Sequence, residues 1–236
     1  MAQEINNRRV LAIAVPIVLS NITVPILGAV DTAVIGQLGK AAPVAAVGVG
    51  AIIITAFYWI FGFLRMGTVG LVSQTFGKSD YRELVNIILR NICIAIIIAF
   101  FIIILKPIIL NIVYQVFAVS SETSDFINDY ISIRVFSAPA ELIIYVLVGF
   151  FLGIQRTTIS SFLIIVLSIL NIFFSIYFVN ELSLNVVGVA FGTLLSSYIT
   201  VISFSIFTYF YIIKKFKVIP RFEAKRLLNF KKIFKL

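Results

Sequence analysis

The sequence contains no histidine and a single cysteine, Cys93. One cysteine cannot form a disulfide within the chain, and it cannot supply a cluster of thiolate ligands. The absence of imidazole excludes histidine metal sites and catalysis that depends on a histidine base. The remaining residues offer no nucleophile–base pair and no metal constellation. We therefore expect a protein that is not an enzyme and that has no cofactor.

Charged residues are also scarce, at 12% of the 236 residues, whereas 61% of the residues are hydrophobic and the mean hydropathy is +1.12. This composition excludes an ordinary soluble domain and indicates an all-α, polytopic membrane protein. The net charge of +9 is concentrated, because nine of the 19 basic residues follow Ile213. Basic residues next to a membrane span favour contact with membrane lipids, and we expect no nucleic-acid partner.

A transmembrane helix needs about 20 mostly apolar residues, and six such windows can be read. They cover residues 10–35, 43–66, 84–105, 126–151, 158–179 and 186–213. The second window can extend past Gly70, and the third ends at Lys106-Pro107. The sequence thus predicts a bundle of six transmembrane helices over residues 1–213, followed by a basic tail over residues 214–236.

Basic residues in the short loops predict the orientation of the bundle. One side carries Arg8, Arg9, Lys78, Arg82, Arg156 and the basic tail. The opposite side carries Lys40 and Lys106 together with Glu122, Asp125, Asp129 and Glu181. We expect a multi-pass protein of the plasma or inner membrane with both termini in the cytoplasm. The tail is either a topology anchor and connecting loop or a segment that lies on the anionic inner leaflet.

Asp31 is the most informative residue of the first window, because it follows Arg9 after 21 uncharged residues. A carboxylate at membrane depth is costly, so we expect it to face a polar cavity, to titrate or to bind a cation. Upstream, Pro16 and Pro25 each remove an intrahelical hydrogen bond and invite a bend. One interpretation is an acid that takes up H⁺ or Na⁺ as the helix bends. The other is an acid at the outer interface that caps the next turn in bulk water.

A polar stripe is predicted on the fifth window. Asn171 and Ser175 are four residues apart, so they stack on one helix face that should point into the bundle. Thr193 on the sixth window is a similar polar residue, with Gly188 and Gly192 nearby. These side chains point into the bundle, where they can hold helices together through interhelical hydrogen bonds.

Arg134 and Glu141 lie seven residues apart in the fourth window. This spacing corresponds to about 10 Å along a helix, so a direct salt bridge would be strained. We expect each to meet a partner on another helix or in a water-filled cavity. Both are candidates for a second titrating group or a substrate cavity, together with Gln74, which follows several spaced glycines near the predicted cytoplasmic mouth.

Four sets of motifs follow one another along the chain. They are Pro16-Ile-Val-Leu-Ser-Asn21 with Val30-Asp31-Thr32-Ala-Val-Ile-Gly36-Gln-Leu-Gly39 and Ala45-Ala46-Val47-Gly48; Gly62-Phe-Leu-Arg-Met-Gly-Thr68 through Gln74 to Gly77; Tyr130-Ile-Ser-Ile-Arg134, Ala138-Pro139-Ala140 and Gly149-Phe-Phe-Leu-Gly-Ile-Gln155; and Asn171-Ile172 with Gly188-Val189-Ala190. In this order the sequence resembles the N-terminal half of the multidrug and toxic compound extrusion (MATE) family, in particular its DNA-damage-inducible protein F (DinF)-like branch.

The resemblance implies one lobe of a twelve-helix fold, in which two six-helix lobes expel organic cations or other amphipathic compounds in exchange for H⁺ or Na⁺. It places Asp31 at the first-helix acid that carries the coupling ion, and Asn171 and Thr193 at polar positions of the cation site. Ser175 stands where many members have an acid. That departure leaves one carboxylate for Na⁺ and favours a proton site, and whether Glu141 compensates is open.

The sequence ends near the linker that joins the two lobes in the family. Three arrangements follow: a split transporter whose C-terminal half is a separate chain, a homodimer of half-units, or a truncated remnant. The expected function is that of a half-length, H⁺- or Na⁺-coupled multidrug antiporter. The alternatives are a non-functional remnant or structural membrane protein and, third, a lipid-linked sugar flippase, for which only Arg134 offers a cavity cation.

Overall fold

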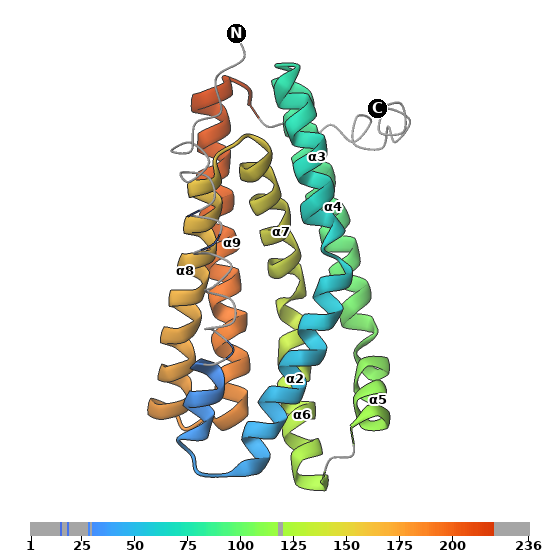
Figure 1. The fold of residues 1–236 in the computed structure, drawn as a ribbon, viewed down its shortest axis with the longest axis vertical. Helices are drawn as coiled ribbons and strands as arrows, with labels where there is room; N and C mark the ends of the chain where they lie inside the picture. The colour runs from blue at the N-terminus through green and yellow to red at the C-terminus, as the bar shows by residue number, and fades with distance from the viewer. Residues whose placement is uncertain (1–14, 16–17, 19–27, 29, 118–119, 220–236) are drawn as a thin grey trace.

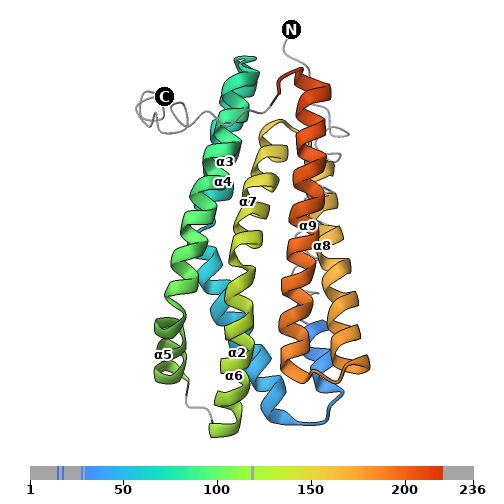
Figure 2. The ribbon, with the colours of Figure 1, turned by 180° about the vertical axis from the view of Figure 1, so that it is seen from behind.

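The computed structural model describes residues 15, 18, 28, 30–117 and 120–219, and the regular structure within these ranges is helical (Figure 1, Figure 2). Residues 30–36 are helical and precede α2. The elements that follow are α2 (Ala41–Ile60), α3 (Phe63–Gly77), α4 (Tyr81–Ile104), α5 (Lys106–Val116), α6 (Ser121–Arg134), the 3₁₀ turn η1 (Val135–Ser137), α7 (Ala138–Gly153), α8 (Thr157–Ile176), the π-helical turn η2 (Tyr177–Glu181) and α9 (Asn185–Phe216).

Five segments of the described residues are long and apolar enough to cross a membrane. They are Ala41–Gly77, Tyr81–Ile104, Ser121–Gly153, Thr157–Glu181 and Asn185–Phe216. These segments correspond to the second to sixth predicted windows, and the second does continue past Gly70. The first window, with Pro16 and Pro25, lies mostly outside the described residues. The expected fold class, an all-α polytopic membrane protein, is confirmed.

Large apolar side chains cover the outside of the bundle. Trp59 is 78% exposed, Met66 79% and Phe210 63%. In water, an apolar surface of this extent would drive association. In a bilayer it faces acyl chains, and the helices satisfy their own backbone hydrogen bonds there.

The fourth span is not the continuous helix that the sequence predicts. Pro139 has no N–H, so the Val135 carbonyl lacks the donor that a regular helix would supply four residues later. That carbonyl accepts instead from the N–H of Ala138, which closes the 3₁₀ turn η1 between α6 and α7. The break leaves backbone carbonyls within the bundle free to accept side-chain hydrogen bonds.

A short helix that the sequence analysis did not predict follows the third span. Lys106-Pro107 ends α4 as expected, but the chain turns directly into α5. Pro107 lies in the first turn of α5, where its missing N–H costs no intrahelical hydrogen bond. Ile109 and Val113 are four residues apart and fully buried, so one face of α5 packs on the bundle.

The loops with basic residues gather at one end of the bundle. The α3–α4 turn, the α7–α8 turn and the end of α9 lie together in Figure 1. The rings of Tyr81 at the start of α4 and Phe216 at the end of α9 stack with centroids 4.8 Å apart, which ties these ends to each other. The acidic start of α6 lies at the opposite end.

Helices α8 and α9 approach each other most closely at Gly192. A methyl group at this position would lie 2.7 Å from both the backbone nitrogen and the Oγ of Ser175. Glycine is therefore required here for packing, as is common where membrane helices meet. The contact also fixes Ser175, one of the predicted site residues, against the backbone of α9.

We predict that Gly192→Ala destabilises the bundle by about 1–3 kcal/mol, because α9 must move away from α8 to relieve the overlap. Thermal unfolding of the purified protein in mild detergent measures the effect. The matched control is Gly67→Ala on α3, where an added methyl group would meet nothing within 4 Å. Equal melting temperatures for the two variants would contradict the close contact.

Candidate functional site

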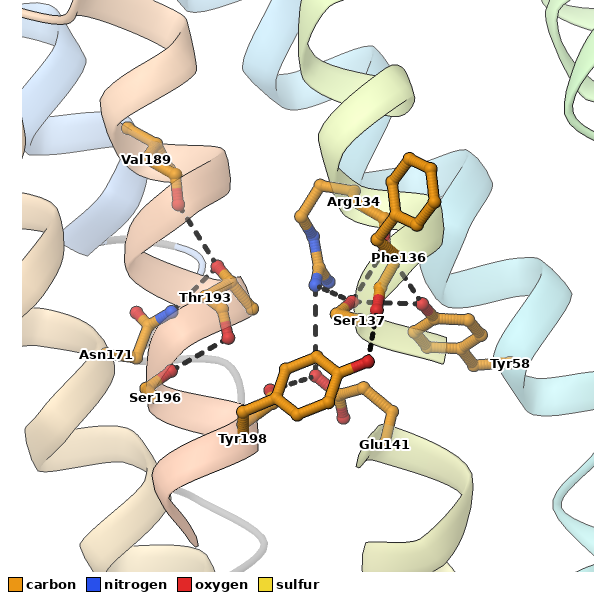
Figure 3. Close-up of polar contacts among 11 residues, drawn as sticks. Tyr58, Arg134, Phe136, Ser137, Glu141, Asn171, Val189, Thr193, Ser196 and Tyr198 are labelled. Carbon is orange, nitrogen blue, oxygen red and sulfur yellow. Dashed lines mark hydrogen bonds and ion pairs between the residues drawn. The ribbon is translucent and has the colours of Figure 1, made fainter. Parts of the chain in front are cut away.

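The polar stripe of α8 faces α9 inside the bundle. Asn171 donates from Nδ2 to Thr193 Oγ1 at 2.8 Å, and Thr193 in turn donates to the carbonyl of Val189 at 3.3 Å (Figure 3). Ser196 continues the α9 side of this cluster by donating to the carbonyl of Thr193 at 3.0 Å. Both Asn171 and Thr193 are buried, so two of the predicted ion-site residues are brought together.

The other two predicted ion-site residues, Asp31 and Ser175, adjoin each other. Both are buried, and the Ser175 hydroxyl lies within interaction range of the Asp31 carboxylate. Their geometry does not complete a hydrogen bond, because Asp31 Oδ1 and Ser175 Oγ both lack a partner among the described residues. The two groups are therefore neighbours with unfilled hydrogen-bonding capacity.

Three buried oxygens of this cluster have unfilled hydrogen-bonding capacity. Asp31 Oδ1, Asn171 Oδ1 and Ser175 Oγ have no hydrogen-bond partner within the described part of the chain. Buried polar atoms are nearly always partnered by protein, water or an ion, so these oxygens are available to accept a hydrogen bond or to bind a cation. One carboxylate, one amide oxygen and one hydroxyl suit a proton, a water or a small hard cation. The described residues contain no group of three His, Cys, Asp or Glu that could hold a metal.

Arg134 and Glu141 form an ion pair, with Nη1 and Oε1 3.8 Å apart. The expectation that a direct pair is too strained was wrong, since the long side chains bridge the axial separation across η1. The expectation of partners on other helices holds for Glu141, which accepts from Ser197 of α9 at 2.9 Å. Figure 3 shows the arginine and the glutamate pointing toward each other between α6, α7 and α9.

Two tyrosines and a serine complete the network around the helix break. Tyr58 of α2 donates to the Arg134 carbonyl at 3.2 Å and contacts Ser137 Oγ at 3.1 Å. Arg134 Nη1 donates to Ser137 Oγ at 2.7 Å. Tyr198 of α9 donates to the Phe136 carbonyl at 3.1 Å (Figure 3). The sequence analysis missed these residues. Pro139 could have indicated them, because a proline within a helix leaves nearby backbone carbonyls available to side-chain donors.

Gln74 does not join this network. It is exposed on α3, beyond Val72, which packs against Gly153. Gly153 follows Glu141 by 12 residues, or about 18 Å along α7. The predicted cavity of Gln74 with Arg134 and Glu141 is therefore not formed, because α3 carries Gln74 toward the end of the bundle. Pro16 and Pro25 lie outside the described residues.

A buried arginine that the sequence analysis did not consider lies on α4. Arg90 is 4% exposed and pairs with Glu83 at 3.6 Å. Glu83 also accepts from Asn86 at 3.1 Å. A charged residue inside a predicted span is the signal that would have identified this pair. Its place in the first turns of α4, near the end that carries the basic loops, suits a structural ion pair at the membrane surface.

Comparison with known proteins identifies what the chain is similar to. The family model described as MatE matches residues 16–177. DNA damage-inducible protein F of Escherichia coli (strain K12) is 34% identical over 190 residues, which cover 80% of this chain and 41% of that protein. An outward-facing multidrug resistance MATE family transporter of the MOP superfamily matches with a TM-score of 0.75 at 19% identity, over 94% of this chain and 48% of that one. A MATE crystal structure in the bent conformation gives 0.77 at 19%, over 92% and 49%. The chain thus spans about half the length of these relatives.

Proposed function

The chain belongs to the MatE family, and from this we propose that it is one six-helix lobe of a secondary active exporter that exchanges amphipathic or cationic compounds for a coupling ion. The observation that carries the proposal is the buried Asp31 carboxylate, whose Oδ1 has no partner among the described residues, beside Ser175 on the α8 face that also carries Asn171. A carboxylate buried at membrane depth is costly, and uptake of a cation relieves that cost. Taking up and releasing that cation can drive the export of another compound.

We propose H⁺ as the coupling ion, with Na⁺ as the alternative. The cluster has a single carboxylate, because position 175 is a serine. Na⁺ carries its charge into the site without forming a covalent bond, so it gains from a second carboxylate that this site lacks. A proton neutralises one carboxylate completely.

Transport needs a second wall for the cavity, since family transporters operate between two lobes. We propose that a separate C-terminal half or a second copy of this chain supplies it. The basic end of the bundle supports a cytoplasmic position for both termini. In that orientation two copies can lie parallel, as two lobes require.

The proposal predicts uptake of the fluorescent cation ethidium into inside-out membrane vesicles that contain the chain and are acidified by respiration. An ionophore that collapses the proton gradient should release the dye. An imposed gradient of Na⁺ is the second arm, and it should drive uptake if Na⁺ is the coupling ion. Vesicles without the chain are the control. Absence of chain-dependent uptake in both arms would contradict the proposed export.

The mass of the assembly purified in mild detergent tests the second wall. Two copies of the chain, or one copy with another six-span chain, support the proposed transporter. A mass equal to that of one chain, with no co-purifying partner, supports the alternative of a non-functional remnant.

A further inference from the structure

Arg134 interacts with two acids. It is 8% exposed, it forms an ion pair with Glu141 of α7, and it acts electrostatically on Asp31 of the first helix. The other titratable groups that face Arg134 or Asp31 are Tyr58 of α2 and Tyr130 of α6. Ser175 and Arg134 act on Asp31, and Asp31 in turn acts on Tyr130.

The guanidinium of Arg134 is only partly satisfied in this structure. Its Nη1 donates to Ser137 Oγ at 2.7 Å and lies 3.8 Å from Glu141 Oε1. The 3.8 Å separation is that of an ion pair without a hydrogen bond. Tyr130 of α6 also interacts with the guanidinium, whereas the buried Nε has no hydrogen-bond partner in residues 30–117 and 120–219.

Asp31 also has a buried atom without a hydrogen-bond partner among the described residues, in this case an acceptor. Its Oδ1 is a buried acceptor without a partner in the same residues. An unpartnered buried donor and an unpartnered buried acceptor of opposite charge therefore lie within electrostatic range. Each is costly to leave unfilled, and both are filled when the two groups meet.

Glu141 competes for the same cation from a fixed position. Ser197 of α9 donates to its Oε1 at 2.9 Å, which is also the oxygen nearest to Arg134. The three ionised groups sum to one negative charge, from two carboxylates and one guanidinium. One monovalent cation on Asp31 brings the buried sum to zero, which is the arrangement that low-dielectric surroundings favour.

We propose that Arg134 is a counter-ion shared by Asp31 and Glu141. It pairs with Asp31 when the coupling site is empty and with Glu141 when Asp31 holds a proton or Na⁺. This inference rests on the proposed function and adds a positioning residue to it. The arginine acts as an internal cation that competes with the coupling ion, so it limits how tightly the ion is held and promotes its release.

The test measures protonation of Asp31 by its reaction with a hydrophobic carbodiimide, which modifies neutral, buried carboxyl groups. The chain is labelled in membranes, in its natural assembly, and digested with trypsin. Residues 10–40 form one tryptic peptide in which Asp31 is the single acid, so mass spectrometry assigns its label without ambiguity. The rates are compared at a pH where wild type reacts at about a tenth of its maximum, and Asp31→Asn is the blank.

The variants form a double-mutant cycle. Arg134→Gln should label Asp31 up to about tenfold faster, because the competing cation is gone. Glu141→Gln should label it several-fold more slowly, because Arg134 is released to Asp31. In the Arg134→Gln background, Glu141→Gln should change nothing, because Glu141 acts only through the arginine.

Three outcomes would overturn the shared counter-ion. The first is a rate change of the same direction in the two single variants. The second is additivity, in which Glu141→Gln slows labelling as much in the Arg134→Gln background as in wild type. The third is no change in either single variant. If Arg134→Gln does not accumulate in membranes, Arg134→Met and Arg134→Lys replace it. Glu141→Gln must then act in the lysine background and fail to act in the methionine background. Failure of the proposed function gives a different result: wild-type Asp31 is not labelled by the carbodiimide at any pH, with or without Na⁺.

Discussion

Asp31→Asn abolishes coupled export in inside-out vesicles, reducing dye uptake to the level of vesicles that lack the chain. Asparagine is close to aspartate in shape, but it can neither gain a proton nor neutralise Na⁺. The buried cluster retains its packing and loses its exchangeable charge. Because the coupling ion supplies the driving force, the expected loss is complete rather than partial, and it is the same at every pH tested.

The matched control is Asp129→Asn, the same chemical change at an exposed position of α6. It should leave uptake unchanged at equal amounts of protein in the membrane. The measurement is the initial rate of ethidium uptake, normalised to the chain content of the vesicles. Uptake by Asp31→Asn at the wild-type rate would remove Asp31 from the coupling site and, with it, the central element of the proposed function.

Hydropathy and residue spacing predicted the spans correctly because membrane burial depends on local composition. The windows at 43–66, 126–151, 158–179 and 186–213 each lie within one observed span, and the window at 84–105 ends one residue after the span that closes at Ile104. Helical periodicity also placed Asn171 and Ser175 on a common buried face. Each of these predictions depends on the residues of one helix alone, so a single sequence was sufficient to make it.

Features that depend on two helices were harder to predict. The ion pair of Arg134 with Glu141 was judged from the helical rise alone, and side-chain length and the η1 turn made it possible. The π-helical turn η2, which begins two residues after Ser175, has no clear signature in the sequence. The hydroxyl of Tyr198 on α9 reaches the Phe136 carbonyl in the η1 turn, a contact between residues 62 apart in the sequence. Such contacts depend on how the helices meet in space.

Ser175→Asp should convert the proposed proton site into a Na⁺ site. The serine hydroxyl already lies beside the Asp31 carboxylate, and the Asn171 Oδ1 on the same face of α8 has no partner in the residues that the structure describes. A second carboxylate at this position raises the negative charge of the cluster by one. The two acids repel each other unless a cation lies between them, so a bound Na⁺ that both carboxylates and the amide oxygen can reach becomes favourable.

Thermal unfolding in NaCl and in KCl at equal ionic strength measures this gain of specificity, because an ion that binds the folded state alone stabilises it. At a Na⁺ concentration about tenfold above its Kd, the variant should gain about 1.4 kcal/mol in NaCl over KCl. Wild type and the neutral control Ser175→Asn should melt at the same temperature in both salts. The larger K⁺ should stabilise the variant less than Na⁺ does, so its effect should be no more than that of ionic strength. An equal response of Ser175→Asp to both salts would show that these oxygens do not converge on one cation, and Asp31 would then have to be neutralised by Arg134 alone.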